Sequence, residues 1–186
     1  MNATITTPVQ FTGTYTIDPG HSTIGFVARH AIVTKVRGTF SDFEGTVSID
    51  AEHPSNSSAQ VTIKAMSSDT HNAARDAHLR SNDFFGMATY PEITFVSTAI
   101  DQIGDTEFRV TGDLTLKGVT KPVAVDVEFL GAATDPSGNE RIGFEGKASV
   151  NRTDWGVSWN AALEAGGVLV SEKVTIELDV SAIKNA

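Results

Sequence analysis

The sequence predicts an all-β domain built from antiparallel strands, and three observations favour this fold class. Apolar and polar residues alternate in several separate segments, glycine- and proline-containing turns lie between these segments, and no apolar run approaches the length of a membrane span. A strand with one apolar and one polar face is typical of an antiparallel sheet that covers a core on one side. A chain of 186 residues suits a single domain.

The expected strands follow one another along the chain. In the first, Ile24, Phe26, Ala28 and His30 share one face. Roughly eight strands at this spacing predict a barrel or a sandwich. The segments that alternate most clearly are 24–30, 61–65, 108–116, 123–129, 142–150 and 174–180.

Turn residues separate these strands. Gly104-Asp105 and the segment 135–139 are typical of hairpin turns, and 53–58 is a polar loop. After Gly118 we expect the next strand to begin near Pro122, because a missing N–H group costs least at the margin of a strand.

One segment breaks the alternation. In residues 72–80, Asn72 can cap a helix, and Asp76 and Arg80 are spaced as neighbours on one helical face. The sequence therefore predicts a short helix between strands. Residues 1–13 are expected to form a flexible N-terminal arm, and residues 14–186 the barrel domain.

Composition and motifs exclude several function classes. Cysteine is absent, so the chain offers no disulfide and no catalytic thiol. The formal net charge of -9 argues against nucleic acid or an anionic membrane as partner, since both attract basic surfaces. The five histidines lack metal-site spacing, so neither a metal nor another cofactor is expected. No nucleophile elbow or phosphate loop is present.

The interior of the predicted barrel decides between the remaining functions. An eight-stranded barrel is just wide enough to be filled by side chains or to hold one small ligand, and periodicity cannot distinguish these cases. Small inward residues such as Ala28 and Gly112 favour a ligand. An enzyme acting on a small apolar substrate would need a titratable group inside, for which His30 is the candidate. A filled barrel would serve as an interaction module.

Blocks of sequence in a fixed order carry a resemblance over nearly the whole chain beyond residue 13. They resemble the YceI-like family, also described as polyisoprenoid-binding, lipocalin-like proteins. The usual Phe or Tyr after the Arg-x-Asp of the last block is Trp155 here. The blocks are Ile17–His30 with Val36–Val47, Asn72–Phe85 with Tyr90–Phe95, Gly112–Pro122, and Gly143–Val168.

The resemblance implies an extended antiparallel eight-stranded lipocalin-like β-barrel with a short helix near one end. It also implies a non-enzymatic carrier that binds, sequesters or transports an isoprenoid-type lipid (polyprenyl, quinone or fatty amide) inside the barrel, without stable membrane insertion. A homodimer is one assembly that the family suggests. Many members are secreted to the periplasm, whereas the first ten residues here show no basic or apolar leader pattern, so we expect a cytoplasmic protein.

Strand parity within this family fold selects the residues expected to contact the lipid. His30, at the end of an apolar strand face, and Arg75 and His78, on the helix expected at the barrel mouth, are expected head-group contacts. For these three, a hydrogen-bonded or solvated side chain is the alternative. The opposite parity of Phe40 and Phe43 indicates a bend around 38–45. The expected lining is Phe26, Ile93, Phe95, Phe108, Leu114, Val127, Phe129, Phe144 and Trp159.

Overall fold

Eleven antiparallel strands form one continuous sheet in the computed structural model, which describes residues 8–186. The strands are β1 (Gly13–Ile17), β2 (Thr23–His30), β3 (Thr34–Phe40), β4 (Phe43–Ile49), β5 (Ser58–Lys64), β6 (Ser68–Asp69), β7 (Glu92–Gln102), β8 (Glu107–Leu116), β9 (Val119–Thr134), β10 (Glu140–Asn151) and β11 (Lys173–Lys184). The helices are α1 (Ala73–Arg80) and the 3-10 turns η1 (Pro8–Phe11), η2 (Pro19–His21), η3 (Pro54–Asn56), η4 (Ala65–Ser67) and η5 (Arg152–Trp155).

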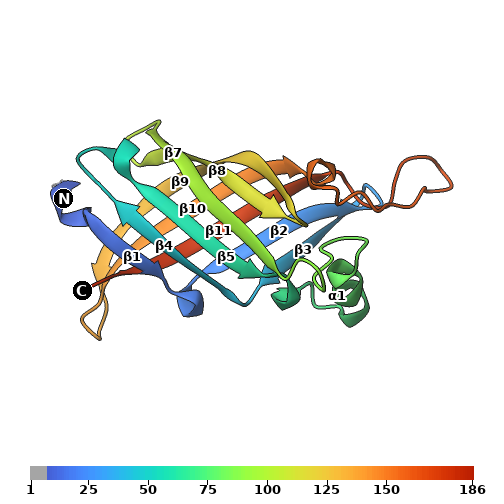
Figure 1. Cartoon of the computed structure of the whole chain (residues 1–186), viewed down its shortest axis with the longest axis horizontal. Helices are drawn as coiled ribbons and strands as arrows, with labels where there is room; N and C mark the ends of the chain where they lie inside the picture. The colour runs from blue at the N-terminus through green and yellow to red at the C-terminus, as the bar shows by residue number, and fades with distance from the viewer. Residues whose placement is uncertain (1–7) are drawn as a thin grey trace.

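The sheet closes on itself. In the order β1, β4, β5, β7, β8, β9, β10 and β11, each strand pairs with the next, and β11 pairs back with β1. The result is an elongated barrel with α1 at one end and both chain termini toward the other (Figure 1). The predicted eight-stranded antiparallel barrel with a short helix near one end is therefore confirmed.

Two of the three other strands, β2 and β3, continue strands of this ring, and β6 pairs with β3. β1 pairs with residues 182–184 of β11, and β2 pairs with residues 175–179 of the same strand. β1 and β2 therefore occupy one position in the barrel wall, with a bend at η2. β3 and β4 likewise follow one another in the wall, and the strand is interrupted between Phe40 and Phe43, within the region where a bend was expected. Both phenylalanines are buried and belong to the same apolar cluster.

Most sequence signals for turns and caps coincide with the structure. Asn72 accepts a hydrogen bond from the N–H of Arg75 and caps α1. The β7–β8 turn contains Gly104, and residues 135–139 join β9 to β10. Pro122, however, lies inside β9 and not at its margin. It is tolerated because β10 pairs with β9 only from Asp126 onward, which leaves this part of β9 at a sheet edge.

The N-terminal segment falls partly outside the described residues. Of the arm expected over residues 1–13, residues 1–7 lie outside them, and Pro8–Phe11 forms η1. The Phe11 ring packs edge-on against Phe129, with ring centroids 5.1 Å apart. Phe11 thereby covers part of the barrel at the end that carries the termini.

Two glycines make room for inward aromatic rings. A Cβ atom at Gly38 would lie 2.2 Å from Cζ of Phe26, which is paired with Gly38 across β2 and β3. A Cβ atom at Gly112 would lie 2.4 Å from Cζ of Phe95 and 2.6 Å from the carbonyl oxygen of Val96. The rings therefore lie against bare backbone on the neighbouring strand.

We expect Gly112→Ala to destabilise the barrel by about 1–3 kcal/mol, because the added methyl group overlaps both a ring and a backbone carbonyl. Gly143→Ala is the matched control, since the nearest atom to its added Cβ is 3.8 Å away. Urea unfolding of the two variants tests the difference. Equal unfolding midpoints would show that the Phe95 ring can move aside at no cost.

Arg141 ties the bend at η2 to the β9–β10 turn. Its Nε donates to Oδ2 of Asp135 at 2.7 Å, and its Nη1 donates to Oδ2 of Asp18 at 2.8 Å. These hydrogen bonds from the guanidinium are the main reason that the pKa of each carboxyl group lies below its usual value. The three side chains are mostly shielded from solvent.

The barrel should lose stability in acid partly through this network. Carboxyl groups with a pKa lowered by folding stabilise the folded state above their unfolded pKa of about 4, and this contribution is lost as the pH falls through the lower folded pKa. In Arg141→Met, the decline in the free energy of unfolding below pH ~4 should be shallower than in the parent. A series of urea titrations at falling pH measures both slopes, and parallel slopes would contradict the assignment.

Candidate functional site

A cavity of about 950 Å³ runs along the inside of the barrel. Every strand of the closed ring contributes apolar side chains to it, and β2 and β3 contribute as well. Sites of about 300–1,000 Å³ hold drug-sized ligands, so this one is large for a small-molecule site. A barrel filled by its own side chains does not fit a cavity of this size.

Most of the residues selected by strand parity line this cavity. The alternation that predicted them holds through the central parts of β2, β7, β8, β9 and β10. Trp159 is the exception: its ring packs against His78 at 4.5 Å and Phe84 at 5.6 Å between centroids, outside the lining. The predicted residues that line the cavity are Phe26, Ile93, Phe95, Phe108, Leu114, Val127, Phe129 and Phe144.

The three expected head-group contacts lie away from the cavity lining. His30 is exposed at the last position of β2, where the barrel wall has ended, so it does not continue the inward face. Arg75 donates from Nε to the hydroxyl of Thr70 at 2.7 Å and from Nη2 to its carbonyl at 2.8 Å. Nε2 of His78 lies 2.8 Å from Oδ2 of Asp83, within hydrogen-bond distance. Each side chain is thus either solvated or held by protein partners.

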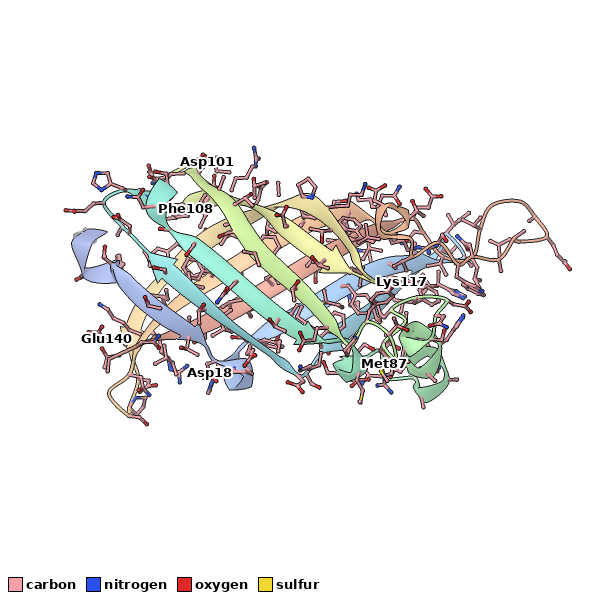
Figure 2. The ribbon with its side chains drawn as sticks, in the orientation of Figure 1. Asp18, Met87, Asp101, Phe108, Lys117 and Glu140 are labelled. Carbon is pink, nitrogen blue, oxygen red and sulfur yellow. The ribbon has the colours of Figure 1, made fainter. Side chains whose placement is uncertain are left out.

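The two ends of the cavity differ in character. Figure 2 shows Phe108 and Asp101 toward one end, and Met87 and Lys117 beside α1 at the other. Next to α1, the lining comes from large apolar side chains that include Leu79, Phe84 and Trp155. The opposite end carries polar side chains among the lining: Gln10, Asp50, Ser57, Gln102, Asp105 and Thr106.

Arg152 is a lining residue that was not selected from the sequence. Only 5% of it is exposed, and its guanidinium donates hydrogen bonds to the carbonyl oxygens of Ser171, Val157, Trp159 and Val170. Burial lowers its pKa from the usual arginine value. Its guanidinium carbon also lies 6.0 Å from the centroid of the Phe84 ring. A buried cation thus borders the otherwise apolar α1 end.

A signal for Arg152 was present in the sequence. It extends the inward series Ile142, Phe144, Ala148 and Val150 by one further alternate position. Trp155 follows within η5, where it is 3% exposed and its indole N–H donates to the carbonyl of Leu114 at 2.9 Å. Trp155 therefore lines the cavity while its one polar atom is satisfied.

Residues 8–186 contain neither a cluster of metal-ligating side chains nor a membrane-spanning helix. No three side chains among the histidines and acids of this part come together as a metal site would require. None of the helices described here has the length and apolar character that crossing a bilayer demands.

Comparison with known proteins agrees with this geometry. The family model of the YceI-like domain matches residues 15–182, which span nearly the whole barrel. The chain belongs to the YceI-like family. A UPF0312 protein of Photorhabdus laumondii is 45% identical to this YceI-like chain over 143 residues, which cover 76% of this chain and 74% of the relative.

Two solved structures share the YceI-like fold. BcnA of Burkholderia cenocepacia superposes with a TM-score of 0.78 at 27% identity, over 89% of this chain and 98% of BcnA. A polyisoprenoid binding domain from Saccharophagus degradans, implicated in plant cell wall breakdown, superposes with a TM-score of 0.66 at 18% identity, over 92% and 98% of the two chains. At that identity the second likeness shows the fold alone.

We expect Arg152→Met to destabilise the protein by about 3 kcal/mol, because four carbonyl groups lose a charged donor. Hydrogen exchange should increase most in residues 157–171, which these carbonyls anchor. Arg109→Met is the control, since that arginine pairs with Asp126 on the exposed surface and its loss should leave the stability nearly unchanged. Unchanged exchange in residues 157–171 would contradict the anchoring role.

Proposed function

We propose that this protein binds a long apolar lipid of the isoprenoid type inside the barrel, and sequesters or transports it. The observation that carries the proposal is the cavity of about 950 Å³ with its apolar lining. Membership of the YceI-like family supports it, and so does the polyisoprenoid binding described for the Saccharophagus degradans domain of the same fold. The proposed contacts are Phe26, Ile93, Phe95, Phe108, Leu114, Val127, Phe129 and Phe144.

Burial of hydrocarbon supplies the affinity in this proposal. Each CH₂ group moved out of water contributes about 0.8 kcal/mol, so one five-carbon prenyl unit contributes up to ~4 kcal/mol before the cost of ordering the chain. A handful of units therefore suffices for tight binding without a specific polar contact. Selection among lipids would rest on the length and width of the cavity.

We further propose a binding protein and not an enzyme. The histidine that sequence parity placed inside the barrel, His30, is exposed at the end of β2. The lining at the termini end of the cavity includes two acids, Asp50 and Asp105, and no histidine. His53, whose Nδ1 lies 3.8 Å from Oδ1 of Asp50, has a side chain that is 71% exposed to solvent and is not part of the lining. Hydrophobic confinement of a guest is the property that this lining offers.

Phe144→Arg should abolish lipid retention. A charged side chain at the centre of an apolar phase costs about 3 kcal/mol, which corresponds to about a hundredfold loss of affinity. Native mass spectrometry before and after organic extraction, with identification of the extract, measures retention. Leu130→Arg is the matched control. Leu130 follows Phe129, which pairs with Phe144 across β9 and β10, but its own side chain is 52% exposed and points away from the cavity lining.

A second variant guards against unfolding of the first. Ala59→Trp places a large apolar side chain into the same cavity and should reduce retention of long-chain lipid while the barrel stays folded. Retention equal to that of the parent in both variants would overturn the lining assignment. An extract of the parent protein without any lipid, after expression in a bacterial host, would count against carriage itself.

A further inference from the structure

The β2–β3 hairpin ends in an exposed apolar tip. Ile32 is 65% exposed and Val33 is 77% exposed, and together with Ala31 they join β2 to β3. Val168, 43% exposed, lies in the loop that approaches the hairpin, since a Cβ atom at Gly167 would lie 3.1 Å from Cδ1 of Ile32. We call Ile32, Val33 and Val168 the apolar tip. Both segments project beyond the barrel at the end that carries α1 (Figure 1).

The backbone at the apolar tip is strained. Ala31 and Ile32 have φ angles of 49° and 71°, in the left-handed region that glycine and asparagine prefer. A β-branched residue such as Ile32 is a genuine outlier there, and such strain concentrates at functional sites. Glycine or asparagine would relieve the strain and would also remove the exposed apolar surface. The chain nevertheless has an isoleucine at this position, where both its backbone conformation and its exposure to solvent are unfavourable.

The hairpin below the apolar tip is basic, although the protein as a whole is acidic. From Thr23 to Phe40 the chain contains Arg29, Lys35 and Arg37 and no acidic residue, against a net charge of -9 for the whole chain. Arg29 and Lys35 are exposed and lie directly opposite one another across β2 and β3. Like charges in this arrangement destabilise a sheet. Within residues 8–186 neither of the two forms an ion pair, whereas Arg37 pairs with Glu177.

The apolar tip is also connected to the α1 end of the cavity. The N–H of Ala31 donates to the carbonyl of Leu169 at 2.7 Å, and the N–H of Ser171 donates to the carbonyl of Arg29 at 2.9 Å. Residues 157–171 include Val157 and Val170, which line the cavity and whose carbonyls Arg152 holds. The apolar tip is therefore hydrogen-bonded to the same segment that borders this end of the cavity.

We infer that the apolar tip docks the barrel, with its α1 end forward, on the surface of a lipid bilayer that contains anionic head groups. Apolar side chains at the point of contact enter the interface, and basic side chains just behind them meet the anionic head groups. The net charge of -9 argues against an anionic membrane as a partner of the whole surface, and the basic hairpin reverses this expectation only at its own end. The acidic remainder of the barrel is repelled by such a surface, which orients the contact. The docking is peripheral and does not depend on the identity of the cargo.

Vesicle sedimentation tests this inference. The full-length protein should sediment with vesicles of phosphatidylcholine and phosphatidylglycerol, and much less with phosphatidylcholine alone or at raised salt. Arg29→Ser and Lys35→Ser should each lower the partition coefficient about fivefold. The double variant Ile32→Asn with Val33→Ser should abolish sedimentation, while its thermal midpoint stays equal to that of the parent or rises because the strained isoleucine is gone.

Matched controls distinguish binding by the apolar tip from nonspecific hydrophobic adsorption and from nonspecific electrostatic attraction. Ile103→Ser with Leu130→Ser removes two exposed apolar residues at the other end of the barrel, and Lys147→Ser removes a mid-barrel lysine that is 72% exposed. Both controls should sediment like the parent. Equal sedimentation of parent and apolar-tip variant overturns the inference.

Light scattering provides the second readout. If the parent is an oligomer that the Ile32→Asn, Val33→Ser variant dissociates, and vesicle binding is unchanged, the apolar tip is a self-association surface and docking on lipid is refuted. Lipid retention is measured on the same variants by native mass spectrometry. Normal retention together with lost sedimentation confirms docking separately from carriage, and lost retention in the cavity variants leaves docking untouched.

Discussion

Closure of the sheet is the constraint on which the rest of the structure depends. The ring is joined by only three residue pairs between β1 and β11, and β2 continues the pairing along the rest of β11. This arrangement pairs the strand edges of the ring, and it turns every inward face toward a common axis. An open sheet with the same sequence would expose that apolar face to water. The cavity and its lining thus both follow from the closed ring.

The interior stays hollow because large and small residues alternate around it. Phe26 and Phe95 lie against glycines on neighbouring strands, so these rings pack along the wall and do not cross the centre. Close packing is the default in protein interiors, and side chains that line a space of about 950 Å³ have no protein partner on that side. A hydrocarbon guest would make dispersion contacts with them.

The sequence predicted the fold well because period-two alternation and turn residues are local signals. The same parity placed eight side chains in the cavity lining, since a strand that lies in the barrel wall turns alternate residues inward. Parity failed where an element ends or leaves the wall. His30 occupies the last position of β2, Trp159 lies beyond η5, and the helical residues Arg75 and His78 are governed by contacts that no strand pattern describes.

Two further features depend on contacts between distant parts of the chain, which local patterns do not describe. Arg152 was within reach of the alternation, but its four carbonyl partners come from a segment without regular structure. The choice between a filled and a hollow barrel depends on how side chains from all strands share the interior. That is a property of the closed ring as a whole, and no single segment encodes it.

The positions of the two tryptophans have a practical consequence. Trp155 lines the α1 end of the cavity, and Trp159 packs against Phe84 just outside it. The chain contains no other tryptophan. Indole emission responds to the polarity of its surroundings, so the intrinsic fluorescence of the unlabelled protein can report in real time any change of polarity at this end of the barrel.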